Sequence, residues 1–164
     1  MILLAIAGFL SAISGCANET ISADAPIRSL ETAKEDGQTP THYDLQILEL
    51  INEHRLAMGL PDLAIDPIVQ VQASKHSSNM ALAQVPFGHG GFQSRAQILL
   101  RELRGSGVAE NVALGQPSAR SVVTAWLASP SHRVNIEGNY MRTGLSAIRN
   151  ASGKWYYTQM FWRP

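Results

Sequence analysis

The sequence predicts an α+β fold: a three-layer α-β-α sandwich with a small antiparallel sheet between helices. Segments with helical spacing of apolar residues fill most of the chain from residue 41 to about residue 136. The spacing changes to a period of two after residue 142, and large apolar side chains then occupy both alternating sets of positions. Because a strand pair of this kind has two apolar faces, we expect helices on both sides of it.

The composition is that of one globular domain. The chain has 164 residues, of which 45% are hydrophobic and 16% are charged, so it is long enough to bury a core of its own. The 13 Lys and Arg residues balance the 13 Asp and Glu residues, and no basic run is present. Nucleic acid is therefore not an expected partner. The single cysteine, Cys16, excludes an internal disulfide framework.

The N-terminus predicts export. Residues 2–14 form an almost unbroken apolar run, shorter than the ~20 residues that span a bilayer but typical of a signal-peptide core. The run leads into Ile13-Ser14-Gly15-Cys16, which resembles the lipobox of bacterial lipoproteins, whose cysteine is acylated after cleavage. Here Ile13 replaces the usual leucine, and no Lys or Arg precedes the run. The alternative is an ordinary secretory signal with an incidental cysteine, and hence a secreted protein.

These features predict three segments. Residues 1–15 are a signal peptide of the lipoprotein type, and Cys16 is the lipidation site that anchors the exported protein to a membrane of the cell envelope. Residues 16–40 are polar and charged without apolar periodicity, as in a flexible tether. Residues 41–164 form the folded domain.

The first helix is expected after Thr41 or Asp44, either of which can cap it, and before Gly59. Its inward positions by helical spacing are Leu45, Leu48, Ile51, Arg55 and Met58. His54 falls on the polar side and is interpreted as a solvated surface histidine. A turn and a short extended piece follow, ending at Ile65.

The second helix is expected to begin at Asp66-Pro67 and to end at Val85-Pro86. His76 falls on its inward stripe. It is either a core histidine satisfied by a backbone carbonyl or by Ser77, or a third imidazole near a cleft.

Three more helices are expected. The third covers residues 94–104, the fourth begins at Pro117-Ser118, and a short one begins at Ser129-Pro130. His132 then lies in the first turn of the short helix, where the helix dipole favours a neutral ring.

The C-terminal residues 142–164 predict a β-hairpin with its turn at residues 150–153. Its second strand places Tyr157 and Phe161 on one face and Met160 and Trp162 on the other.

Glu110 is the candidate centre of a site. It stands between small and apolar residues in Gly107-Val108-Ala109-Glu110-Asn111-Val112-Ala113. Because a buried carboxylate is unfavourable without a cationic or hydrogen-bonding partner, Glu110 needs one. His89, in the Gly-rich loop of residues 87–92, and His132 are the best candidates. We expect His89, Glu110 and His132 to meet in one cleft.

Two histidines and one glutamate are the ligand types of an open zinc site. His89, His132 and Glu110 are therefore candidate ligands for Zn²⁺ or another divalent metal, and candidate catalytic residues of a metal-dependent hydrolase. No His-Glu-x-x-His motif is present. Ser131 adjoins His132, but neighbouring residues on a helix do not face each other, which disfavours serine hydrolysis.

Five segments occur in an order that resembles the CAP superfamily, which includes cysteine-rich secretory proteins, venom allergens and plant pathogenesis-related proteins. The bacterial branch is the most similar, through its Ser-Pro-x-His-Arg-x-Asn-Ile motif. The resemblance covers about residues 43–162 and implies an α-β-α sandwich. The segments are Leu50-Ile51-Asn52-Glu53-His54-Arg55, His76-Ser77-Ser78-Asn79-Met80-Ala81, Ala109-Glu110-Asn111-Val112-Ala113, residues 126–136, and Tyr157-Thr158-Gln159-Met160-Phe161.

In eukaryotic members of that superfamily a cavity carries two histidines and two glutamates. By resemblance, His89 is the first histidine and Glu110 the first glutamate, whereas Ser129 and Tyr156 replace the other two. His132 supplies an imidazole from elsewhere in the chain, and His76 and Tyr156 are secondary cleft residues. The disulfides of the family are also missing.

The resemblance implies a binding module at the cell envelope, because related domains bind sterols, fatty acids or other partners. We expect a His/Glu cleft that binds a lipid, cell-wall, protein or metal ligand and is not primarily catalytic. In the simplest version, His89, Glu110 and His132 only pin loops together. The alternative is a metal-dependent, peptidase-like hydrolase.

Overall fold

A computed structural model describes residues 39–164 of the chain. The expected signal peptide, Cys16 and almost all of the expected tether lie outside these residues. The elements along the described part are α1 (His42–Ala57), β1 (Ala64–Ile65), α2 (Pro67–Ala81), α3 (Phe92–Glu102), β2 (Gly107–Leu114), α4 (Ala119–Ala128), α5 (Pro130–Ile136), β3 (Arg142–Arg149) and β4 (Trp155–Arg163). No helix among residues 39–164 has the length and apolarity to cross a membrane.

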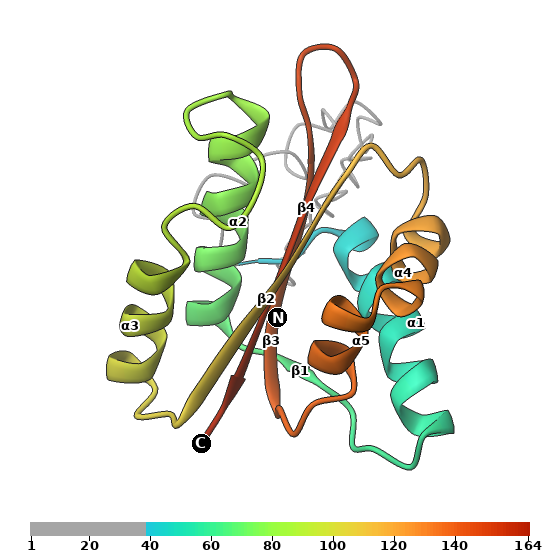
Figure 1. The fold of residues 1–164 in the computed structure, drawn as a ribbon, viewed down its shortest axis with the longest axis vertical. Coiled ribbons are helices and arrows are strands. Elements are labelled where there is room, and N and C mark those ends of the chain that lie inside the picture. Colours follow the sequence, from blue (N-terminus) through green and yellow to red (C-terminus); the bar gives the residue numbers. More distant parts are fainter. Residues whose placement is uncertain (1–38) are drawn as a thin grey trace, which may run out of the picture.

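The strands form one sheet between two layers of helices. The strand order is β1-β3-β4-β2. β4 pairs antiparallel with both β2 and β3, and the two-residue β1 pairs parallel with β3. Figure 1 shows α2 and α3 on one side of the sheet and α1, α4 and α5 on the other. The predicted α-β-α sandwich is therefore confirmed, as is the hairpin that ends it.

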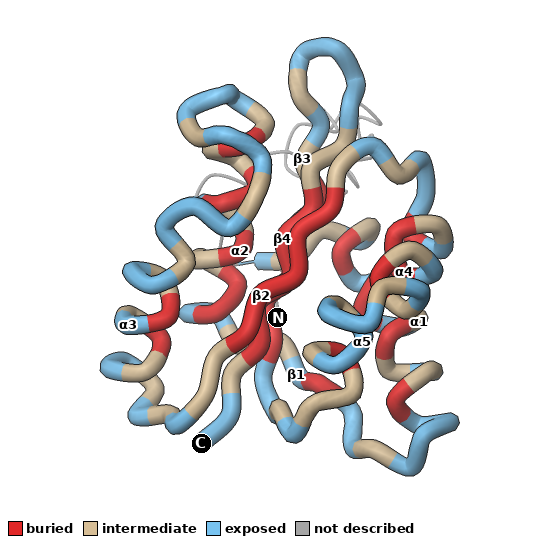
Figure 2. Tube along the Cα trace, in the orientation of Figure 1, coloured by how far each residue is buried: buried red, intermediate tan, exposed pale blue. Residues whose placement is uncertain are grey.

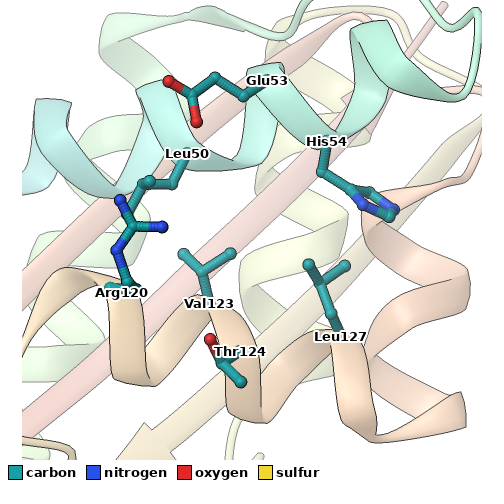
Figure 3. Close-up of a pocket in the computed structure, with 7 residues that line it drawn as sticks. All are labelled: Leu50, Glu53, His54, Arg120, Val123, Thr124 and Leu127. Atoms are coloured by element: carbon teal, nitrogen blue, oxygen red, sulfur yellow. The ribbon is translucent and has the colours of Figure 1, made fainter.

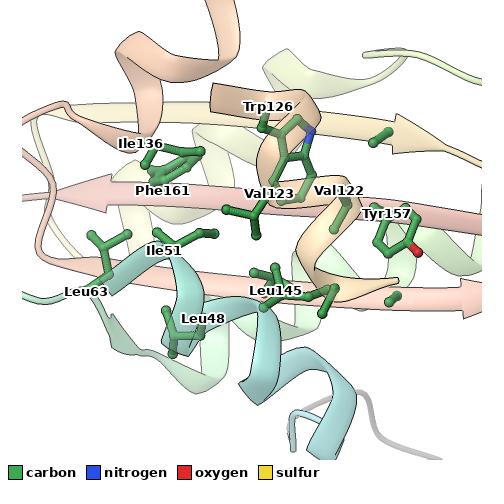
Figure 4. Packing of buried hydrophobic residues seen from close by; sticks show 14 of the residues in the cluster. Leu48, Ile51, Leu63, Val122, Val123, Trp126, Ile136, Leu145, Tyr157 and Phe161 are labelled. Atoms are coloured by element: carbon green, nitrogen blue, oxygen red, sulfur yellow. The ribbon is translucent and has the colours of Figure 1, made fainter. Parts of the chain in front are cut away.

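The alternating side chains of β4 supply both cores. Tyr157 and Phe161 are buried under α1, α4 and α5, where the rings of Tyr157 and Trp126 meet nearly at right angles at a centroid distance of 6.4 Å. Figure 4 shows this larger cluster from close by. On the other face, Met160 packs with residues of α2 and α3 in a smaller cluster. Figure 2 shows the buried residues concentrated along the central strands and the inner faces of the helices.

α1 begins where expected but buries a different set of side chains. Thr41 and Asp44 form a capping box at its start. Leu45 and Met58, expected inside, are 44% and 57% exposed. Asp44 is buried instead, because its carboxylate also accepts a 2.8 Å hydrogen bond from the backbone N–H of Ala147 on β3.

α2 ends earlier than predicted. It stops at Ala81, and Ala83 turns the chain with a positive φ of 56°. Sequence spacing extended this helix to Val85 because Ala83 continued the apolar stripe. The segment after the turn carries His89, and α3 then begins behind Gly91, which has a φ of 75°.

β2 was not anticipated as a strand. It is an edge strand of the sheet, and its Glu110 stands opposite Met160 of β4. Because opposed residues of antiparallel strands share a face, Glu110 lies on the α2/α3 side of the sheet. Its neighbour Asn111 stands opposite Gln159 and lies on the α1/α4/α5 side.

Candidate functional site

Glu110 is a buried carboxylate with every oxygen engaged. Its side chain is only 1% exposed. Oε1 accepts hydrogen bonds from His89 Nδ1 and Arg95 Nη2, both at 2.9 Å, and Oε2 accepts from Arg95 Nε and Nη2 at 2.9 and 2.7 Å. Four hydrogen bonds match the number that a carboxylate accepts when saturated. The expectation that Glu110 has a partner, and that His89 is one, is confirmed.

Arg95 is the partner that sequence reasoning missed. It lies in the first turn of α3, its side chain is 12% exposed, and it forms a forked ion pair with Glu110. It also donates to the carbonyl oxygen of Gly90 at 2.8 Å. A signal was available, because Arg95 is one helical turn before the buried Leu99 and therefore belongs to the inward face of α3.

His89 is the accessible end of this arrangement. Its side chain is 51% exposed, although its Nδ1 lies 2.9 Å from the buried carboxylate. Since Glu110 accepts at Nδ1, that nitrogen carries a proton, and in the neutral ring the other nitrogen, Nε2, has the lone pair. No other residue among 39–164 hydrogen-bonds to Nε2. Gly88, with a φ of 136°, gives the loop a backbone conformation that side-chain-bearing residues rarely adopt.

His76 of α2 hydrogen-bonds to the loop that carries His89. It is 2% exposed, and its Nε2 donates to the carbonyl oxygen of Gly88 at 2.8 Å. Burial is the main cause that lowers the pKa of His76, and the charges of Arg95 and His89 act in the same direction. The backbone-carbonyl partner considered from the sequence is therefore confirmed, and the ring also lies within electrostatic range of the site.

His132 approaches from the opposite side of β2. It lies in the first turn of α5, and its backbone carbonyl accepts a hydrogen bond from Asn111 Nδ2 at 3.1 Å. Burial lowers the pKa of the His132 ring, and the charge of His89 lowers it further. The direction agrees with the expected neutral ring, but burial is the leading cause. His132 makes no hydrogen bond with Glu110, so the convergence of all three residues in one cleft stays a prediction.

The two positions that differ from the eukaryotic tetrad are both half-buried. Ser129 begins α5, and its Oγ lies 3.2 Å from Ser131 Oγ. Tyr156 stands opposite Leu114 at the end of β2. Alternation along β4 places it on the same face as Met160 and therefore as Glu110.

The metal site formed by His89, His132 and Glu110 also stays a prediction. Among residues 39–164, no group of three or more His, Cys, Asp or Glu side chains is arranged to hold a metal ion. Glu110 has no free oxygen in this arrangement, because Arg95 and His89 occupy both. Of the three predicted ligands, His89 keeps its Nε2 free of hydrogen bonds within residues 39–164, and Glu110 stands behind its Nδ1.

His54 is not the solvated surface histidine that its polar neighbours suggested. Its Nε2 lies 2.9 Å from Glu137 Oε1, at the end of α5, and its side chain is 25% exposed. The pair joins two helices through residues that are 83 positions apart in the chain.

Comparisons with known proteins agree with this architecture. The model of the cysteine-rich secretory protein family, CAP, matches residues 48–161. The uncharacterized protein YkwD of Bacillus subtilis is 27% identical over 148 residues, covering 88% of this chain. The match covers 56% of YkwD, so this chain spans little more than half of that relative.

Solved structures show the same fold. An outer surface protein of Borrelia burgdorferi has a TM-score of 0.63 at 24% identity, covering 76% of this chain and 96% of its own. An extracellular protein of Bacillus anthracis with an SCP domain has a TM-score of 0.59 at 27% identity, covering 74% and 40%. A cysteine-rich secretory protein of Staphylococcus aureus has a TM-score of 0.59 at 22% identity, covering 74% and 39%.

The family match extends from within α1 almost to the end of β4, and so includes every element that carries a candidate site residue. The chain belongs to the cysteine-rich secretory protein family, CAP.

Proposed function

We propose that this CAP domain acts outside the cytoplasm and binds a ligand through His89, with divalent metal as the first class to test. The observation that carries the proposal is the hydrogen-bonded group formed by Arg95, Glu110 and His89, which we call the relay. A buried, bidentate ion pair fixes a carboxylate, and that carboxylate fixes the tautomer of a half-exposed imidazole.

The chemistry of the relay favours binding at Nε2. A carboxylate behind Nδ1–H is the arrangement that orients histidine ligands of zinc. His132 adds a second imidazole, and its lowered pKa keeps the ring neutral and its lone pair available near pH 7. Because Arg95 compensates the charge of Glu110, the site attracts a ligand through imidazole nitrogen rather than through net negative charge.

Zinc titration by calorimetry at pH 7.5 tests this function. We expect saturable binding that is lost in His89→Ala and weakened in His132→Ala. Glu110→Gln should weaken binding about 10- to 100-fold, because it removes the group that orients His89. His42→Ala is the matched control, since His42 is exposed and, within residues 39–164, its side chain hydrogen-bonds only to Gln46. Equal heats for the wild type, His89→Ala and His132→Ala would contradict the proposal.

A second candidate function is hydrolysis at the cell envelope, and the same relay favours it. An imidazole whose Nδ1 is held by a carboxylate can act as a general base through Nε2. In that case Glu110→Gln should abolish turnover of a peptide substrate. Turnover that persists in Glu110→Gln would place the chemistry elsewhere.

The anchoring part of the proposal rests on the sequence Ile13-Ser14-Gly15-Cys16. We propose export followed by lipidation of Cys16, with residues 16–40 as the tether. The extracellular SCP-domain protein of Bacillus anthracis supports the location. Metabolic labelling with palmitate should mark the wild type and not Cys16→Ser. An unlabelled wild-type protein would favour secretion without an anchor.

A further inference from the structure

The outer edge of β2 directs main-chain groups away from the sheet. β2 ends the strand order β1-β3-β4-β2, and Figure 1 shows it crossing in front of β4. The N–H of Gly115, one residue beyond β2, donates to the carbonyl oxygen of Trp155, the next pair in the register of β2 with β4. Opposed pairs in an antiparallel ladder alternate between bonded and non-bonded, so the odd-numbered residues of β2 bond to β4. The even-numbered residues point their N–H and C=O groups outward; they are Val108, Glu110, Val112 and Leu114.

Contacts at this edge agree with that orientation. Asn135 Nδ2 of α5 donates to the carbonyl oxygen of Glu110 at 3.4 Å, and Trp126 Nε1 of α4 donates to that of Val112 at 3.3 Å. The outward N–H groups of β2, in contrast, have no acceptor among residues 39–164. The edge is also accessible at Glu110, because the whole residue is 6% exposed and its side chain only 1%, which leaves mainly main chain on the surface.

The opposite edge of the sheet is closed by partners. On β3, the N–H of Leu145 donates to Gln70 Oε1 at 2.9 Å. The N–H of Ala147 donates to Asp44 Oδ1 at 2.8 Å, and β1 pairs with Thr143. Folded proteins protect their sheet edges in such ways, because unpaired N–H groups bind another chain readily. The outward N–H groups of β2 lack this protection, as at a site of strand addition.

The spacing of the outward N–H groups determines which partner fits them. Residues two apart along a strand are separated by about 6.8 Å. The carbonyl oxygens along one side of an extended peptide repeat at the same distance, so several can accept at once. A small anion would reach only one of these N–H groups.

The two candidate imidazoles belong to segments that flank the same strand. His89 bonds to the side chain of Glu110 on the α2/α3 side of the sheet. On the other side, Asn111 bonds to the backbone carbonyl of His132. The space beside β2 is therefore bounded on both faces of the sheet. A single extended chain fits such a space, whereas a second copy would have to bring its own flanking segments into it.

From this arrangement we propose that β2 binds an extended peptide as an added strand, along its outward N–H groups and between His89 and His132. The carbonyl oxygens of the peptide accept from these N–H groups, and its side chains alternate between the two faces of the sheet. Because main-chain groups provide the recognition, many peptide sequences fit. The inference goes beyond the proposed function, since it uses the main chain of β2 and requires no metal at His89.

The probe is the capped hexapeptide acetyl-Val-Thr-Val-Thr-Val-Lys-amide, titrated into the ¹⁵N-labelled protein in the presence of EDTA and followed by NMR. We expect a dissociation constant on the order of a millimolar, because binding must order a flexible chain. The amide signals of Val108, Glu110 and Val112 should move downfield as they gain acceptors. Those of Ala109 and Asn111, which already bond to β4, should move less.

Three outcomes of this titration would overturn the proposal. The first is a set of shifts along β2 without the alternation between even and odd residues. The second is a set of shifts confined to α1 and α4, which would place the peptide in the hollow between these helices that Figure 3 shows. The third is the absence of shifts with the probe about tenfold above a millimolar.

A modified peptide tests the role of the main chain on the wild-type protein. The same hexapeptide with every internal amide N-methylated keeps its side chains but cannot lie against a strand as a ladder partner. It should bind at least about tenfold more weakly. Equal affinity of the two peptides would show that side chains, not main-chain groups, provide the recognition, and would overturn the proposal.

Val108→Pro tests the edge from the side of the protein. Proline is tolerated where the N–H of an edge strand points outward, and here it removes one donor and places its ring on the edge. Binding should weaken about tenfold. His42→Pro is the matched control, because it puts proline at the exposed first position of α1, where proline is also tolerated, and should bind normally. A folded Val108→Pro variant that binds like the wild type would contradict the proposal.

Two further measurements separate this inference from its alternatives. Shifts of the β2 amides on raising the protein concentration without peptide would assign the edge to a second copy and overturn the proposal. Peptide binding should be equal with and without EDTA. Failure of the zinc titration therefore leaves this inference standing, and failure of the peptide titration leaves the proposed function standing.

Discussion

Glu110, Arg95 and His89 come from three different segments: β2, α3 and the loop between α2 and α3. The carboxylate is buried, whereas His89 is half exposed. Of the two partners of Glu110, Arg95 should contribute more to stability. Its ion pair with Glu110 is largely buried, whereas solvent screens the interaction of Glu110 with the exposed His89 more strongly.

Replacing Arg95 tests this ranking. Arg95→Gln leaves Glu110 buried with only His89 beside it, so the free energy of unfolding should fall by about 3 kcal/mol. His89→Ala should lower it by about 1 kcal/mol or less. Urea unfolding measures both. In the double variant Arg95→Gln/Glu110→Gln part of the loss should return, because no unpaired charge remains; equal losses in single and double variants would contradict the ranking.

His76 gives the folded protein a pH dependence. Its pKa is lowered below the ordinary value of 6.5 in the folded state. The unfolded chain therefore takes up a proton first as the pH falls, so stability is full above about pH 6.5 and is lost as the pH drops toward the folded pKa. His76→Gln should flatten the dependence of unfolding free energy on pH between about 7.5 and 5.5.

His132 contributes with the same sign, since its pKa is also lowered. His132→Gln should therefore flatten the curve as well. A His76→Gln curve parallel to that of the wild type would show that protonation of His76 is not linked to unfolding.

Among the elements, α2 packs unusually closely on β3. Gln70 of α2 forms two hydrogen bonds with the backbone of Leu145, at 2.8 and 2.9 Å. Next to it, a Cβ on Gly144 would lie 2.3 Å from the backbone carbon of Val69. The helix backbone thus rests directly on the strand, which only glycine permits.

Gly144→Ala should consequently lower the free energy of unfolding by about 3 kcal/mol, because neither backbone can move without disturbing the Gln70 pair. Thermal or urea unfolding measures the change. Gly90→Ala is the control, since its Cβ would meet nothing within 4 Å, and its effect should stay within about 0.5 kcal/mol. A Gly144→Ala variant as stable as Gly90→Ala would mean that α2 can move away from β3.

For the molecule as a whole, Arg55 joins distant segments. It is fully buried, and its guanidinium donates to the carbonyl oxygens of Pro61, Ile136, Gly138 and Tyr140. These carbonyls belong to the last residue of α5 and to the connections that follow α1 and α5, up to 85 residues from Arg55. Burial lowers the pKa of Arg55, and the charge of Asp62 opposes that shift.

Arg55→Met should destabilise the protein by about 3 kcal/mol, because it leaves four carbonyls, including that of the buried Ile136, without the donor that Arg55 supplies. Arg55→Lys should recover only part of the loss, since an ammonium cannot span the same set of acceptors. Arg133→Met changes an exposed arginine and should be nearly neutral. Unfolding free energies that coincide for Arg55→Met and Arg133→Met would contradict this role.

The sequence by itself determined the layers of this domain. The period of two in β4 puts Tyr157 and Met160 on opposite faces, and two apolar faces require two layers of helices. It also determined that Glu110 needs partners, because the isolation of a carboxylate among apolar residues is a local property. His89 followed from the same reasoning.

Only the tertiary structure decided which charges meet. Arg95 reaches Glu110 because α3 packs beside β2, and His54 reaches Glu137 because α1 and α5 both pack against α4. The pairing of β2 with β4, which buries Glu110, likewise joins segments about 50 residues apart. Local spacing tells which face of a helix or strand is inward, but not which other segment it will face. That choice depends on the packing of the whole chain.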